Sequence, residues 1–337
     1  MIQIGGLRLV RSLPSFHRPF LCHRKFTMAT SNGSATPNPG RELKILMIHG
    51  YTQSGHTFEI KTKALKKSLE KHFPAAPKPG HLQQYPGGLE LVYPTAPMKL
   101  DYTDIPGYDV DGPSNPIEAY GWWKRRGDDE PYTYEGMEQG LEALAKVLKE
   151  QGPFDGALGF SQGGAAAGMV AALLEDGRRE AFEKQQAKGG MRYPDQFTND
   201  TGYVEEAIHP PLRFAVSYSG FGASTHPLYR AFYEPKIKTP MMHFLGSVDT
   251  VVSEDRSLRL VEACVDGKGK PGGVDRVVYH PGGHFLPSSN KQYVAALVGF
   301  IREVIGEPAG ASNATSGTAT PQRGIGDEKA EDMDVPF

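Results

Sequence analysis

F-D-G-A-L-G-F-S-Q-G-G, residues 154–164, is the stretch of the sequence that decides the fold. The apolar run 154–160 predicts a buried strand, and the small residues of 164–174 predict a helix directly after a sharp turn. A turn of the form G-x-S-x-G, here at 159–163, holds its serine on a strained backbone at the carboxyl end of the strand. Ser161 is therefore the candidate nucleophile, although an ordinary glycine-rich turn has the same composition.

Ser161 needs a general base, and an acid that orients the base, because a serine hydroxyl alone is a poor nucleophile. After this kind of turn the two follow in the order acid, then histidine. Asp249 follows the predicted strand 240–246, and His284 lies in a glycine-rich loop after the predicted strand 274–280. In a parallel sheet both residues lie at the same edge as Ser161, which predicts a Ser-His-Asp triad.

Other polar residues compete for these roles. Asp255 and Asp266 are possible acids, but they lie in or after a predicted helix rather than at a strand end. His280 is a possible base, but the glycine-rich loop lets the later histidine reach back over the sheet. His49 follows the first strand and is predicted to brace its loop. Ser54 lacks the strand–turn–helix context of a nucleophile.

Strand and helix patterns alternate along residues 43–305, which predicts an α/β domain with a mostly parallel central sheet flanked by helices. The predicted strands are 43–48, 89–93, 154–160, 214–218, 240–246 and 274–280, and the predicted helices are 58–73, 133–150, 164–174, 253–264 and 290–305. All three members of the predicted triad follow strands of this set.

Six stretches form a recognisable series along the chain. They are K-I-L-M-I-H-G-Y-T-Q-S-G (44–55), Y-G-W-W (120–123), G-P-F-D-G-A-L-G-F-S-Q-G-G (152–164), F-A-V-S-Y-S-G-F (214–221), L-G-S-V-D-T-V-V (245–252) and H-P-G-G-H-F-L-P (280–287). In this order they resemble the FSH-type serine hydrolases of the α/β-hydrolase superfamily. That family includes fungal serine hydrolases and the ovarian-cancer-associated hydrolase of animals. The resemblance implies an α/β-hydrolase fold.

The resemblance also implies an activity, the hydrolysis of carboxylic esters or thioesters through an acyl-enzyme. By their match to the family pattern, Tyr51 and Gln162 would give the two backbone N–H groups of the oxyanion hole. No cofactor and no metal ion is expected. A peptidase, an acyl-releasing thioesterase of a biosynthetic, polyketide-like pathway, and a catalytically silent scaffold that binds ligands or proteins are the alternatives.

Two regions are candidates for the walls of the substrate cleft. Residues 98–119 form a long loop without periodicity, and such loops often border a functional site. Trp122 and Trp123 could form an aromatic wall for the acyl group, but a buried structural cluster is the slightly favoured interpretation.

An insertion over residues 175–211 is expected to form a lid, because α/β-hydrolases often carry lids at the catalytic edge. Its aromatic residues, Phe182, Tyr193, Phe197 and Tyr203, would then cover the cleft and favour medium to long acyl chains over acetate. A surface excursion without contact to the cleft is the alternative.

The composition limits the partners of the chain. Its 337 residues are 39% hydrophobic, which suits one large domain, and the net charge of −2 predicts no general attraction to nucleic acid. Two cysteines cannot form a disulfide framework. No apolar run is long enough for stable membrane insertion. We expect a small-molecule acyl ester or thioester as partner, and the oligomeric state stays open.

The two ends of the chain differ in composition from the rest. Residues 1–42 are basic and nearly free of acidic residues, as in a disordered extension or a mitochondrial targeting segment, and Met28 is a plausible second start. Residues 306–337 have the composition of a disordered tail. A cytoplasmic, possibly also nuclear, location is predicted, with a mitochondrial one as the alternative.

Overall fold

The computed structural model describes residues 40–105, 118–200, 205–269 and 273–306, all of which belong to one compact unit, residues 37–337. The predicted extension before residue 40, the tail after residue 306, Tyr203, and 106–117 of the predicted cleft loop lie outside the described residues. Among the helices of the described part, none has the length and apolar character that spanning a bilayer requires.

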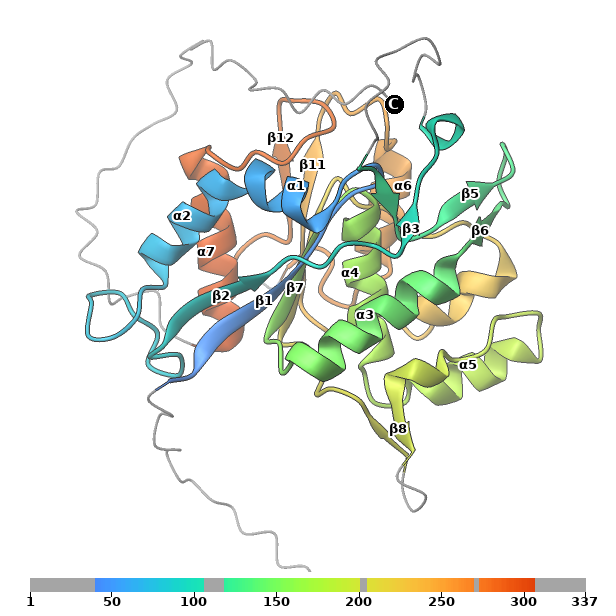
Figure 1. Cartoon of the computed structure of the whole chain (residues 1–337), viewed down its shortest axis with the longest axis horizontal. Helices are drawn as coiled ribbons and strands as arrows, with labels where there is room; N and C mark the ends of the chain where they lie inside the picture. The colour runs from blue at the N-terminus through green and yellow to red at the C-terminus, as the bar shows by residue number, and fades with distance from the viewer. Residues whose placement is uncertain (1–39, 106–117, 201–204, 270–272, 307–337) are drawn as a thin grey trace, which may run out of the picture. The chain divides into compact units, whose positions relative to one another are not determined.

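A six-stranded sheet forms the centre of this unit, and every pairing within it is parallel (Figure 1). From one edge to the other its strands are β12 (Val277–His280), β11 (Met241–Gly246), β10 (Phe214–Tyr218), β7 (Gly156–Phe160), β1 (Glu42–Ile48) and β2 (Gly88–Val92). The predicted α/β-hydrolase fold with a parallel sheet is confirmed. All strands therefore present their carboxyl ends at one edge of the sheet.

Helices cover both faces of the sheet (Figure 1). One layer contains α3 (Met137–Gln151), α4 (Gln162–Leu173) and α6 (Glu254–Glu262), and the other contains α1 (Gly55–Lys61), α2 (Lys63–His72) and α7 (Lys291–Ile305). Strand β1 serves both layers, because Leu46 and Ile48 pack into the first core and Ile45 and Met47 into the second. This alternation is the period of two that a buried strand requires.

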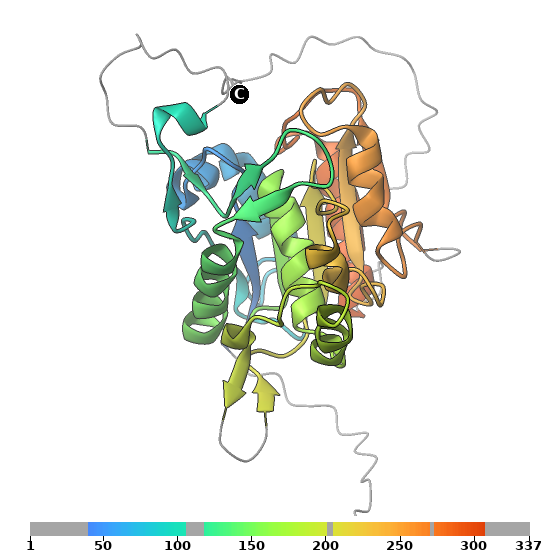
Figure 2. The same ribbon diagram turned by 90° about the vertical axis from the view of Figure 1, so that its right-hand side faces the viewer.

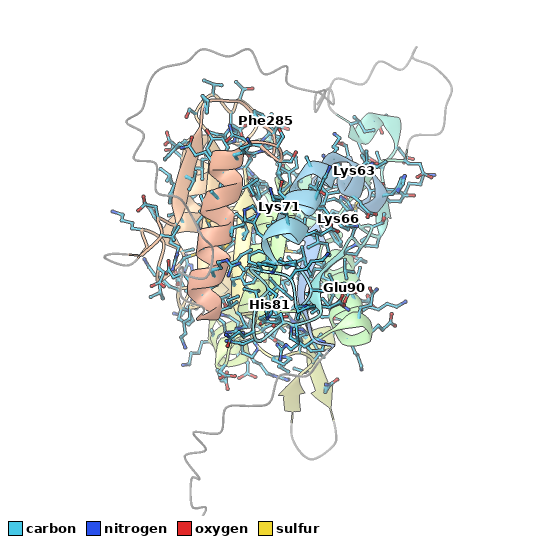
Figure 3. The ribbon with its side chains drawn as sticks, turned by 90° about the vertical axis from the view of Figure 1, so that its left-hand side faces the viewer. Lys63, Lys66, Lys71, His81, Glu90 and Phe285 are labelled. Atoms are coloured by element: carbon cyan, nitrogen blue, oxygen red, sulfur yellow. The ribbon has the colours of Figure 1, made fainter. Side chains whose placement is uncertain are left out.

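The first helical segment consists of two helices rather than the predicted single one over 58–73. The break falls at Thr62, whose hydroxyl donates to the carbonyl of Phe58 at 2.7 Å. On α2, Leu65 is buried, while Lys63 and Lys71 project outward, as Figure 3 shows. These lysines therefore form the solvated face of an amphipathic helix.

Three pairs of short antiparallel strands extend the fold: β3 (Met98–Lys99) with β4 (Tyr120–Gly121), β5 (Lys124–Arg126) with β6 (Thr133–Glu135), and β8 (Thr198–Asp200) with β9 (Glu205–Ala207). The predicted helix 133–150 is wrong at its start, because residues 133–135 pair with β5. Gly136, with φ of 77°, then turns the chain into α3. This left-handed conformation suits glycine best.

The insertion 175–211 does not form the predicted lid. Its helix α5 (Arg178–Gln186) packs against the short helix η3 (Pro227–Phe232), and Phe182 is fully buried edge-on to Tyr193 and Phe232. The insertion lies at the C-terminal end of α4 (Figure 2), whereas Ser161 precedes the N-terminus of that helix. None of the described residues of the insertion lines the cavity beside Ser161. A helix that starts at the carboxyl edge of the sheet ends at the opposite edge, so the segment after it emerges there.

Candidate active site

Ser161 occupies the sharp turn between β7 and α4 with φ of 52° and ψ of −116°. A residue other than glycine rarely adopts this conformation, so the turn stores strain. A Cβ at Gly159 would lie 1.9 Å from the carbonyl oxygen of Gly163, and a Cβ at Gly163 would lie 1.9 Å from that of Ile48. The two glycines of the motif are therefore required by the close approach of the helix to the strands.

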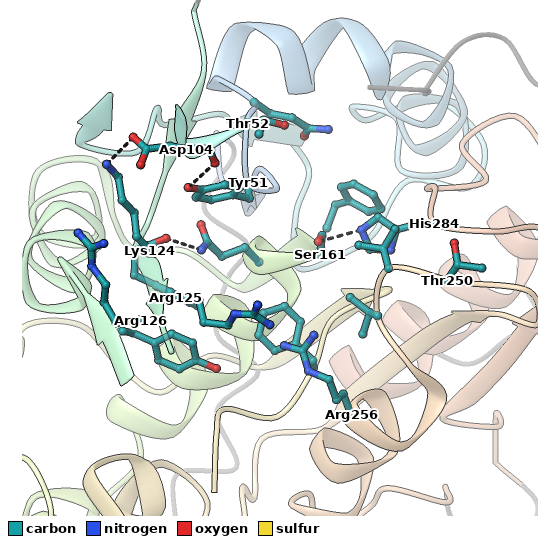
Figure 4. A pocket seen from close by; sticks show the side chains of 18 of the residues that line it. Tyr51, Thr52, Asp104, Lys124, Arg125, Arg126, Ser161, Thr250, Arg256 and His284 are labelled. Atoms are coloured by element: carbon teal, nitrogen blue, oxygen red, sulfur yellow. Dashed lines mark hydrogen bonds and ion pairs between the residues drawn. The ribbon is translucent and has the colours of Figure 1, made fainter. Parts of the chain in front are cut away.

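His284 reaches back over the sheet edge from the loop after β12. Its Nε2 lies 2.9 Å from the Oγ of Ser161 (Figure 4), and its Nδ1 lies 2.8 Å from Oδ2 of Asp249. The imidazole is 6% exposed and packs against the ring of Phe160 with centroids 5.0 Å apart. The structure thus brings together the three residues predicted as a triad, in the hydrogen-bonded order that general-base activation of a serine requires.

Asp249 lies in the loop after β11, and its carboxylate is fully engaged. Oδ1 accepts the N–H groups of Val251 and Val252, each at 2.9 Å, while Oδ2 faces His284. Burial raises the pKa of this carboxyl, but the hydrogen bond and charge of His284 and the two backbone donors outweigh burial, so the pKa lies below its ordinary value. An ionised carboxylate only accepts, so Nδ1 of His284 carries the ring proton and Nε2 offers a lone pair to the serine.

The competing residues have other contacts. Asp255 is exposed in the first turn of α6, and His280 is buried against the ring of Phe285. The hydroxyl of Ser54 caps α1. His49 braces its loop as predicted, since Nδ1 donates to the carbonyl of Gly50 and Nε2 accepts the N–H of Ala96. Burial lowers the pKa of His49 to about 4, so the ring is neutral in the folded protein.

The residues predicted to donate to an oxyanion, Tyr51 and Gln162, both line the cavity that contains Ser161. Tyr51 follows β1, and Gln162 is the first residue of α4. Within the described residues, no protein acceptor is found for the backbone N–H of either one. Both N–H groups are therefore available to a ligand, and the helix N-terminus behind Gln162 favours negative charge there.

The side chain of Gln162 has a role that sequence analysis missed. Its Oε1 accepts the N–H of Trp122 at 2.7 Å, and its Nε2 donates to the carbonyl of Trp123 at 2.8 Å. Trp122 is fully buried and donates its indole N–H to the carbonyl of His49, so it is part of a buried cluster, the interpretation favoured from the sequence, and not a wall of the cleft. Trp123 is 1% exposed but does line the cavity. No sequence pattern predicts that the side-chain amide of Gln162 bonds to these two buried backbone groups.

The cavity beside Ser161 has a volume of about 680 Å³, within the range of small-molecule sites. The described part of the predicted cleft loop contributes Thr103 and Asp104 to its lining. Four cationic residues of the cavity were not predicted from the sequence: Lys124, Arg125, Arg126 and Arg256 (Figure 4). The run K-R-R at 124–126, directly after the tryptophans, was the one available signal for them.

Comparison with known proteins identifies the family of this chain. The family model described as serine hydrolase (FSH1) matches residues 38–296. The chain is 30% identical over 284 residues to Family of serine hydrolases 3 of Saccharomyces cerevisiae, covering 80% of this chain and 88% of that protein. It is also 30% identical over 260 residues to esterase OVCA2 of Danio rerio, covering 74% of this chain and 92% of that protein.

One similar protein is much longer. The chain is 31% identical over 254 residues, 73% of its length, to a protein of Schizosaccharomyces pombe named dihydrofolate reductase. The match covers 44% of that protein, so this chain spans less than half of the relative's length.

Proposed function

This chain belongs to the serine hydrolase (FSH1) family and is a hydrolase, and we propose that it cleaves carboxylic esters or thioesters through an acyl-enzyme on Ser161. The observation that carries the proposal is the continuous hydrogen-bonded series from the Oγ of Ser161 through His284 to Asp249. The series begins at a strained serine on the wall of a cavity of suitable size.

Acylation follows from this geometry. The Oγ of Ser161 attacks the carbonyl carbon while Nε2 of His284 takes the hydroxyl proton, and Asp249 stabilises the imidazolium. The oxyanion accepts the backbone N–H groups of Tyr51 and Gln162, and the loss of one such donor typically costs about 3 kcal/mol. The tetrahedral intermediate then expels the alkoxide or thiolate, which receives the proton from Nε2.

Deacylation repeats the same steps with water. Nε2 of His284 takes a proton from a water molecule, whose oxygen attacks the acyl carbon, and the collapse returns the proton to the Oγ of Ser161. The acid is released and the free enzyme is restored. A panel of p-nitrophenyl esters and acyl-CoA thioesters distinguishes an esterase from an acyl-releasing thioesterase.

The test is labelling with a fluorophosphonate probe, which reacts with activated serines. Wild type should be labelled and should hydrolyse p-nitrophenyl acetate, whereas Ser161→Ala should do neither. Ser219→Ala is the matched control, because Ser219 also follows a strand end with positive φ, yet its buried Oγ has no partner among the described residues. A silent scaffold would show neither labelling nor hydrolysis in the wild type.

A further inference from the structure

The cavity beside Ser161 holds positive charge that the proposed hydrolysis does not use. Among its lining residues are four cations, Lys124, Arg125, Arg126 and Arg256, and one carboxylate, Asp104. Lys124 is paired with Asp104, and Arg126 is paired with Glu135. In the part of the chain that the structure describes, no ion pair is found for Arg125 or Arg256.

Glu130, a carboxylate that interacts electrostatically with Arg256, already pairs with another arginine. Glu130 bonds both of its oxygens to Arg259, at 2.7 and 2.8 Å. The pKa of Glu130 is lowered, first by this hydrogen bonding and also by the charge of Arg256. Arg259 is the bidentate partner, and among the described residues Glu130 forms no ion pair with Arg256.

Arg125 and Arg256 approach from opposite walls of the cavity. Arg125 belongs to β5 and Arg256 to α6, and Figure 4 shows the two guanidinium groups pointing toward one another. The Cζ of Arg256 lies 4.2 Å from the ring centroid of Phe221, and that of Arg125 lies 5.4 Å from the ring centroid of Tyr132. Stacking of this kind uses the face of a guanidinium and leaves its in-plane N–H donors available.

One N–H donor of Arg256 is buried without a partner and is not among those open to the cavity. The Nε of Arg256 is closed off from solvent and has no hydrogen bond to the described residues. The exposed donors point to an anion instead, because two facing guanidiniums repel one another and an anion between them relieves that repulsion. Carboxylate and phosphate groups both match the planar fork of arginine.

We infer that Arg125 and Arg256 form a subsite for a carboxylate or phosphate group of the substrate, which makes the preferred ester or thioester an anionic one. The inference rests on the proposed hydrolysis at Ser161, whose cavity both arginines share. The anion can belong to the acyl chain or to the leaving group.

The test compares kcat/KM for substrates matched in size and different in charge. On the acyl side, mono-p-nitrophenyl glutarate is compared with its neutral methyl ester, and on the leaving-group side, S-acetyl-4′-phosphopantetheine is compared with S-acetylpantetheine. Wild type should favour at least one anionic member by about tenfold or more, the effect of one charge-assisted hydrogen bond. The preference should weaken as ionic strength rises.

Arg125→Gln and Arg256→Gln should each reduce the preference several-fold, and the double variant should abolish it by lowering kcat/KM for the anionic members. Arg192→Gln, a change at a 74% exposed side chain outside the cavity, is the matched control and should change neither. The inference is overturned if wild type hydrolyses neutral esters through Ser161 without favouring an anionic member, or if the double variant keeps the preference. If wild type hydrolyses none of the substrates and Ser161 is not labelled, the proposed hydrolysis fails and the inference fails with it.

Discussion

Asp249→Asn changes one atom of the predicted triad, and the surrounding contacts determine its outcome. Oδ1 of Asp249 accepts two backbone N–H groups, from Val251 and Val252, so an asparagine must keep its oxygen there and turn its NH₂ group toward His284. An NH₂ group only donates, so Nδ1 of His284 becomes the acceptor and the ring proton moves to Nε2. In that tautomer Nε2 donates to the Oγ of Ser161 and cannot take its proton.

Asp249→Asn is expected to lower kcat strongly and the free energy of unfolding only slightly. A histidine held in the wrong tautomer lowers kcat by about 10⁴-fold, which corresponds to ~5.5 kcal/mol of transition-state stabilisation. The fold keeps both backbone hydrogen bonds to Oδ1, so the free energy of unfolding should fall by only about 1 kcal/mol. Steady-state hydrolysis of p-nitrophenyl acetate near neutral pH gives the first quantity, and urea unfolding gives the second.

Asp255→Asn is the matched control, because it removes the same charge from an exposed position on α6. It should leave kcat nearly unchanged. If Asp249→Asn keeps kcat within about tenfold of wild type, the tautomer argument is refuted, because a unit of interacting catalytic residues does not tolerate the loss of its orienting acid.

Three further predictions follow from the structure. Phe182→Ala should lower the free energy of unfolding by about 3–5 kcal/mol because it leaves a cavity at a buried site. The dependence of KM on acyl-chain length should stay unchanged. A changed dependence would mean that the insertion contacts the substrate as a lid does. Burial lowers the pKa of His49 to about 4 and of His243 to about 3. Both histidines take up protons below about pH 6.5 only when unfolded, so stability should be full above that pH and fall toward pH 4 by about 1 kcal/mol per histidine and pH unit. Equal urea midpoints across this range would contradict the assignment. A chain that starts at Met28 should fold and hydrolyse esters like the full chain, and we propose a cytoplasmic location for both; mitochondrial fluorescence of the tagged full chain alone would indicate targeting instead.

The fold was predictable from the sequence because its signals are local. Each central strand is a short apolar run, and the parallel sheet follows from their alternation with helices. The residues of the predicted triad could be chosen for the same reason, since Ser161 follows β7 directly and Asp249 and His284 lie in the loops just after β11 and β12. Asp255 and His280 could be set aside by position alone, and in the structure His284 bonds to Ser161 and Asp249 bonds to His284.

The features that could not be predicted depend on the direction in which the chain runs and on contacts between residues far apart in the sequence. The lid was wrong because α4 carries the chain away from the catalytic edge, a consequence that its start at Ser161 already implied. Trp122 could not be separated from Trp123 by composition, because both are buried and only Trp123 lines the cavity, a difference set by the contacts of Trp122 with Gln162 and His49. The facing of Arg125 and Arg256 joins positions 131 residues apart in the sequence, and no local pattern predicts such a pair.

The central claim is that Ser161 carries the acyl group during turnover. Rapid acid quenching of wild type during hydrolysis of p-nitrophenyl acetate, followed by peptide mass mapping, measures this directly. We predict an acetyl group on the peptide that contains Ser161, lost in Ser161→Ala together with the burst of p-nitrophenol. An acetyl group on another side chain such as Ser54, or unchanged turnover by Ser161→Ala, would contradict the account.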